Sequence, residues 1–85
     1  MKYKILLETK ARKQFLDLPT SIQQRIQDAI DDLSENPRAP GIKKLSGTDG
    51  YRVRQGDYRI LFAINDMAKE IHILTIGHRR EVYRR

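Results

Sequence analysis

Arginines at close spacing in the second half of the sequence suit the binding of phosphate groups. Arg52 and Arg54 occupy alternate positions, and Arg59 follows five residues later. A guanidinium group keeps its charge in proteins and donates two parallel hydrogen bonds that match phosphate oxygens. Such a cluster attracts RNA, DNA or an acidic protein. The alternative is a basic surface that contacts only solvent.

The positive charge is concentrated in the same half of the chain. The 85 residues include 17 Lys and Arg and 11 Asp and Glu, which gives a net charge of +6. Residues 1–42 hold seven basic and six acidic residues, a net of +1. Residues 43–85 hold ten basic and five acidic residues, a net of +5. We therefore expect an anionic partner to meet the second half of the chain.

The pattern around these arginines predicts strands. Tyr51 and Val53 alternate with Arg52 and Arg54, and this alternation is typical of a strand with one buried side. Further strands are predicted at residues 42–45, 58–64 and 70–76, with turns at 55–57 and 65–69. Gly77 is expected to end the last strand.

The first half predicts one strand and two helices. Tyr3, Ile5 and Leu7 alternate with Lys2, Lys4 and Glu8, which indicates a short strand. Thr9 is expected to cap a helix that runs to about Leu18. Thr20 or Ser21 is expected to cap a second helix, which ends before Pro37 because the residue preceding a proline avoids helical geometry. The second helix carries an apolar stripe at residues 22, 26, 29, 30 and 33.

These elements predict an α+β fold in a single domain over residues 1–85. The expected order is β-α-α-β-β-β: an N-terminal strand, a helical hairpin and a three-to-four-stranded antiparallel meander. The hairpin should cover one face of the sheet, and an antiparallel sheet can leave its other face open. Strand parity then predicts that Arg52, Arg54 and Arg59 share the open face. Three guanidinium groups are costly to hold together there without an anion between them.

Composition excludes several kinds of chemistry. The chain has no cysteine, which removes disulfides, thiolate metal sites and thiol nucleophiles. It has no clustered carboxylates of the kind that bind magnesium, and we expect no metal and no cofactor. No apolar run approaches the roughly 20 residues that span a bilayer, and the first residues lack a signal-peptide core. We therefore expect a cytoplasmic protein that does not associate with membranes.

The order of short motifs resembles one protein family. The stretches that carry the resemblance are 44–47 (KLSG), 51–54 (YRVR), 56–59 (GDYR) and 77–83 (GHRREVY). Together they resemble the RelE/ParE superfamily of bacterial and archaeal toxins. The Leu18-Pro19 pair before an Ile- and Gln-rich helix is also common in that family. The resemblance covers essentially the whole chain.

The resemblance implies a toxin of a type II toxin–antitoxin system. RelE members cut messenger RNA in the ribosomal A site, and ParE members inhibit DNA gyrase on a similar scaffold. The RelE-like catalytic positions correspond here to five residues: Arg52, Arg54, Arg59, Arg79 and Tyr83. Arg80 is an alternative match for the position assigned to Arg79. All five are suitable residues, which favours the nuclease branch.

Metal-free RNA cleavage would assign roles to these side chains. The ribose 2′-OH attacks the adjacent phosphate, which requires a base, an acid and cations that stabilise the crowded phosphorane. Arg59 is the first choice for that cation, because a well-placed donor contributes about 3–4 kcal/mol. His78 and Glu81 are the candidates for proton transfer, since both can change charge easily and an unperturbed histidine titrates near neutrality. The alternative for Glu81 is an ion pair with Arg79 or Arg80. The alternative for His78 is a solvated histidine at a strand end.

The remaining candidate residues would contact the RNA. Tyr83 would stack on a base or hydrogen-bond a phosphate, unless it is a packed C-terminal anchor. Lys43, Lys44 and Arg80 are candidates for phosphate contacts.

The leading prediction is a ribosome-dependent messenger-RNA endonuclease. One alternative is a ParE-like protein that binds and poisons gyrase without chemistry, and another is a detoxified relative that retains only antitoxin binding. The expected partners are message in the ribosomal A site and an acidic, amphipathic antitoxin, in a toxin–antitoxin complex of higher order.

Overall fold

The computed structural model has the predicted α+β architecture, and the structure describes residues 2–47 and 50–78. The chain order is β1 (Lys4–Leu7), α1 (Thr9–Leu16), α2 (Thr20–Glu35), β2 (Lys43–Lys44), β3 (Gly50–Gln55), β4 (Tyr58–Asn65) and β5 (Glu70–His78). Neither helix has the length and apolar character to cross a bilayer in these described ranges.

All the strands form one sheet in the order β1-β5-β4-β3-β2. The last four strands form the predicted antiparallel meander, because each pairs antiparallel with the next along the chain. β1 joins the sheet at the other edge and lies parallel to β5, with Leu6 beside His72. The two helices make the connection between β1 and the meander.

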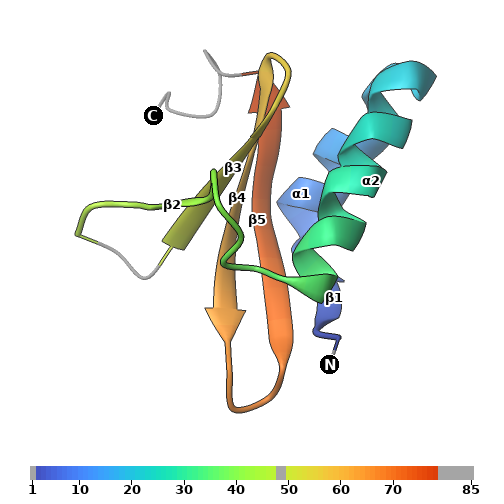
Figure 1. The fold of residues 1–85 in the computed structure, drawn as a ribbon. Coiled ribbons are helices and arrows are strands. Elements are labelled where there is room, and N and C mark those ends of the chain that lie inside the picture. Colours follow the sequence, from blue (N-terminus) through green and yellow to red (C-terminus); the bar gives the residue numbers. More distant parts are fainter. Residues whose placement is uncertain (1, 48–49, 79–85) are drawn as a thin grey trace.

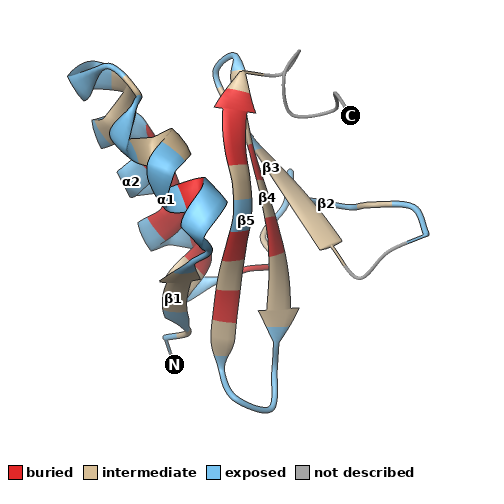
Figure 2. Cartoon of the chain, turned by 180° about the vertical axis from the view of Figure 1, so that it is seen from behind, coloured by how far each residue is buried: buried red, intermediate tan, exposed pale blue. Residues whose placement is uncertain are grey.

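Both helices lie on one side of the sheet, and β2 and β3 swing away from them (Figure 1). We call this side the helix side. The buried residues concentrate on α2, β4 and β5, where the helices and the sheet meet (Figure 2). The two residues of β2 are exposed. In the described part of the chain, no helix covers the opposite side of the sheet.

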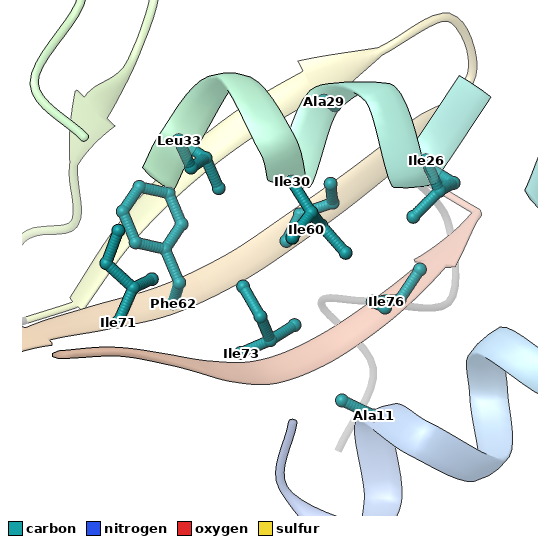
Figure 3. Close-up of a cluster of buried hydrophobic side chains, with 10 residues drawn as sticks. All are labelled: Ala11, Ile26, Ala29, Ile30, Leu33, Ile60, Phe62, Ile71, Ile73 and Ile76. Atoms are coloured by element: carbon teal, nitrogen blue, oxygen red, sulfur yellow. The ribbon is translucent and has the colours of Figure 1, made fainter. Parts of the chain in front are cut away.

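The core lies between α2 and strands β4 and β5 (Figure 3). Its buried side chains are Ala11, Ile26, Ala29, Ile30, Leu33, Ile60, Phe62, Ile71, Ile73 and Ile76. The stripe predicted on the second helix supplies four of them, which confirms the helical period. Each large apolar side chain stabilises the fold by about 1.5–3 kcal/mol through its burial.

A β-bulge brings three isoleucines of β5 to the core. Leu61 pairs with Thr75 but Phe62 pairs with Ile73, so Leu74 is an extra residue between them. The extra residue shifts the alternation by one position. Ile76 therefore faces the helix side together with Ile73, although the two residues are an odd number of positions (three) apart.

Several predicted element boundaries were wrong. α1 ends at Leu16, and Thr9 is its first residue instead of its cap. α2 begins at Thr20 directly after Pro19, and neither helix has a side-chain cap at its N-terminus. At the C-terminal end of α1, the side-chain amide of Gln23 donates to the carbonyl oxygens of Phe15 (3.1 Å), Leu16 (3.3 Å) and Leu18 (3.1 Å). Because β5 continues to His78, Gly77 does not end it.

Candidate nucleic-acid interface

A two-residue turn sets the register of the strands that carry the predicted arginines. Gln55 pairs with Tyr58, so Gly56 and Asp57 form the turn between β3 and β4. Gly56 has a φ of 60°, a conformation that disfavours residues with a Cβ atom. Glycine at the first central position is typical of the turns whose twist matches paired strands. The turn therefore fixes which residues of β3 and β4 lie opposite each other.

The register brings basic side chains together at this end of the sheet. Arg54 lies directly opposite Arg59, and Arg52 lies opposite Leu61 on one side and Lys43 on the other. Directly opposed residues in an antiparallel pair point to the same side of the sheet. We call this set of side chains, Lys43, Arg52, Arg54 and Arg59, the basic face.

The basic face points away from the helices. Tyr51 and Val53 of β3 and Tyr58 of β4 pack against the core, and Ile60 is buried in it. Residues alternate between the two sides of a strand. Arg52, Arg54 and Arg59 therefore lie on the side opposite the helices, which is the arrangement that strand parity predicted.

Like charges directly opposite each other in a sheet repel. Arg54 is exposed, and its Nε donates a hydrogen bond to the carbonyl of Gly56 at 3.3 Å. Arg52 and Arg59 are half-buried. An anion that contacts several of these groups would relieve the repulsion, and the guanidinium geometry suits a phosphate. The basic face can therefore bind a polyanion, and it supplies permanent charge to any phosphate held there.

The two neighbouring lysines lie on different sides of the sheet. Lys43 belongs to the basic face because it pairs with Arg52. Lys44 pairs with Tyr51 on the helix side, and its Nζ lies 5.3 Å from the centre of the Tyr51 ring. Of the two lysines predicted as candidates for phosphate contacts, Lys43 shares a side of the sheet with the arginines and Lys44 does not.

His78 does not lie with the arginines. It pairs with Tyr58 at the end of β5, and the two rings meet edge to face with centroids 5.7 Å apart. Since Tyr58 packs on the helix side, His78 is also on that side. His78 therefore lies on the opposite side of the sheet from Arg59, and its role in proton transfer stays a prediction. Four other candidates, Arg79, Arg80, Glu81 and Tyr83, lie outside the described residues.

Two polar clusters had no signal in the sequence, because their members come from distant parts of the chain. His72 lies between two carboxylates, with Nδ1 3.4 Å from Glu8 and Nε2 3.1 Å from Glu70. Arg38 and Tyr3 both hydrogen-bond Asp66.

The second cluster shifts the pKa of both of its charged groups. The hydrogen bonds from Arg38 and then from Tyr3 lower the pKa of Asp66 to about 2. The same ion pair raises the pKa of Arg38 well above its usual value. Both shifts favour the charged forms of the two side chains. Their ion pair links the loop before β2 to the turn after β4.

Comparisons with known proteins agree with the fold. A family model described as the ParE toxin of the type II toxin–antitoxin system parDE matches residues 5–83. Toxin RelG of Mycobacterium tuberculosis is 35% identical over 89 residues, which cover 100% of both chains. The putative toxin RelE1 of Methanocaldococcus jannaschii is 31% identical, covering 99% of this chain and 98% of the relative.

A solved structure extends the similarity to three dimensions. The archaeal RelE–RelB complex from Pyrococcus horikoshii matches with a TM-score of 0.82 and 31% identity, covering 95% of this chain and 99% of that one. The α+β fold is that of the small RelE-like toxins. The chain belongs to the ParE toxin family, and it is a RelE-like toxin of a type II toxin–antitoxin system.

Proposed function

We propose that this toxin is a ribosome-dependent endoribonuclease that cuts messenger RNA in the ribosomal A site. The observation that carries the proposal is the direct opposition of Arg54 and Arg59, with Arg52 on the same side of the sheet. A non-enzymatic inhibitor would not need three guanidinium groups converging on one surface. The relatives named RelG and RelE1 support the RelE-like branch.

In the proposed reaction, the 2′-oxygen of a ribose attacks the adjacent phosphorus. A base removes the 2′ proton, and the bond from phosphorus to the 5′ oxygen breaks. The products are a 2′,3′-cyclic phosphate and a 5′ hydroxyl, which takes up a proton. Arg59 stabilises the charge that develops on the phosphorane, and Arg52 and Arg54 hold the RNA backbone.

The arginines of the basic face provide charge but no proton transfer. Arginine is effectively never deprotonated in proteins. The acid and base must therefore come from other residues or from the ribosome. Dependence on the ribosome follows, because bound ribosomal RNA and protein would also orient the message for attack, which contributes about 7–11 kcal/mol in the best cases.

We further propose that an acidic, amphipathic antitoxin neutralises the toxin. The net charge of +6 and the basic face favour a partner with carboxylates. The similar Pyrococcus horikoshii protein was solved as a complex of RelE with RelB. The expected binding is salt-sensitive in its association rate.

Inhibition of DNA gyrase is the second candidate, because the matching family model is that of the ParE toxin. The order in which cellular processes stop after induction separates the two functions. If the proposal is right, incorporation of labelled amino acids fails before incorporation of labelled thymidine. If DNA synthesis fails first, the gyrase function replaces the nuclease function.

A further inference from the structure

The strand that carries Lys43 is a short edge strand of the sheet. β2 has two residues, lies at the edge of the sheet and pairs only with β3 in the described part of the chain. Beyond the pair, the Leu45 amide donates to the carbonyl of Gly50 at 2.9 Å. A strand this short needs support from neighbouring side chains to keep its position.

Arg38, in the loop before β2, provides such support through Asp66. Its Nη1 lies 3.1 Å from Asp66 Oδ1, and its Nη2 lies 2.8 Å from Asp66 Oδ2. This two-point geometry fixes the direction of the guanidinium as well as its position. Tyr3 donates its hydroxyl to the same carboxylate at 2.8 Å, which ties Asp66 to the N-terminal segment. The loop before β2 is thus attached to the turn after β4.

The same guanidinium contacts the ring that supports β2. Arg38 Cζ lies 5.7 Å from the centre of the Tyr51 ring, and Lys44 Nζ lies 5.3 Å from it. Tyr51 in turn stacks on the buried Phe62, with centroids 5.7 Å apart. The contacts of Arg38 and Lys44 with Tyr51 therefore connect the loop and β2 to the core. Each cation–π contact at an exposed site is weak, so we expect the ion pair with Asp66 to be the main anchor.

We propose that Arg38 is a positioning residue that acts through Asp66 and Tyr51 to hold Lys43 beside Arg52, where Lys43 contacts an RNA phosphate. Arg38 lies with Tyr51 on the helix side, so it does not contact the RNA itself. The proposal rests on the proposed RNA-binding function. Arg38 is not part of the basic face, but the position of Lys43 in that face depends on it.

The test measures the affinity for RNA as a function of salt. The probe is a fluorescein-labelled single-stranded RNA with 2′-O-methyl groups, which cannot be cleaved by 2′-OH attack, and binding is followed by anisotropy. A plot of log K against log salt has a negative slope. For a single strand, each lost phosphate contact should reduce the magnitude of that slope by about 0.7. We expect this loss for Lys43→Ala and equally for Arg38→Ala. The double variant should lose no more than either single variant.

A matched control separates positioning from loss of charge. Lys2→Ala removes one positive charge and one exposed ion pair, between Lys2 Nζ and Glu35 at 3.2 Å, and it should leave the slope unchanged. Asp66→Ala provides the sharper test because it removes a negative charge. Simple electrostatics predicts that Asp66→Ala binds RNA more tightly, whereas the positioning role predicts the same loss of slope as Arg38→Ala.

Hydrogen exchange separates failure of the positioning role from failure of the RNA function. Exchange of the Leu45 amide should become faster in Arg38→Ala and remain unchanged in Lys2→Ala. An unchanged Leu45 exchange rate, or tighter RNA binding by Asp66→Ala, would overturn the positioning role. A loss of slope by about 1.4 in the double variant would show that Arg38 contacts phosphate directly and would also overturn it. A wild-type protein without salt-dependent RNA binding would overturn the proposed function and the role of Arg38 in it.

Discussion

Arg54 and Arg59 lie directly opposite each other across the turn between β3 and β4, on the side of the sheet away from the helices. Directly opposed like charges repel each other in a sheet. Two permanent positive charges held together in this way favour an anion as the binding partner. This relationship is the basis for assigning the phosphate-binding role to the side opposite the core.

The first prediction is that Arg59→Ala abolishes toxicity and leaves the fold intact. Removing one well-placed cation should lower the cleavage rate by about 10²–10³-fold. Toxicity is measured as growth after induction, and folding as a cooperative thermal transition. Arg25→Ala is the matched control, because Arg25 is an exposed arginine of α2 and should be dispensable. Full toxicity of Arg59→Ala at matched expression would show that the site is assigned wrongly.

The sequence predicted the strands and the basic face well because both depend on alternation. The side of the sheet that holds Arg52 and Arg54 follows directly from the burial of Tyr51 and Val53. Alternation fails at a bulge, and Leu74 introduces one in β5. The extra residue lies in the strand that ends at His78, so no simple count along β5 could predict the side on which His78 lies.

Contacts between distant segments could not be predicted from the sequence. The carbonyls at the C-terminal end of α1 accept hydrogen bonds from the side chain of Gln23 on the next helix, a contact that no local capping rule predicts. Asp66 and Arg38 are 28 residues apart, and only the folded sheet brings them together. The parallel pairing of β1 with β5 likewise joins the two ends of the described chain.

The second prediction concerns Gln23. Gln23→Ala should lower the free energy of unfolding by about 1 kcal/mol, because it removes hydrogen bonds to carbonyls at the end of α1. Urea denaturation measures the change. Gln24→Ala is the control: Gln24 is exposed on the same helix, donates only to Asp28 and should change stability by less than about 0.5 kcal/mol. Equal effects of the two substitutions would argue against the capping role.

The third prediction concerns the turn that sets the register of the arginines. Gly56→Ala should destabilise the protein by about 1–2 kcal/mol, because alanine is strained at a φ of 60°. In the described part of the chain, no atom beyond the two adjacent residues lies within 4 Å of the added Cβ, so the cost should come from the backbone alone. Gly56→Asn should be milder, since asparagine adopts this conformation more readily. Denaturation curves that rank alanine above asparagine in stability would contradict this explanation.

The fourth prediction concerns acid stability. Because folding lowers the pKa of Asp66 from 3.8 to about 2, the charged carboxylate stabilises the fold at pH values above about 4. That contribution is lost as the pH falls from about 4 to about 2, and it should be small because the ion pair is exposed. Melting temperatures between pH 2 and pH 5 should therefore depend less on pH in Asp66→Asn than in the wild type. An identical pH dependence in both proteins would contradict the assignment.

The most direct measurement of the proposed activity is cleavage of message in a reconstituted translation complex. Wild-type toxin, Arg59→Ala and Arg25→Ala are incubated with a labelled message, alone and programmed on ribosomes with an empty A site. We predict cleavage by the wild type and Arg25→Ala only on the ribosome, with 2′,3′-cyclic phosphate ends, and little or none by Arg59→Ala. Uncut message with the wild type, together with inhibition of gyrase supercoiling, would contradict the proposed activity.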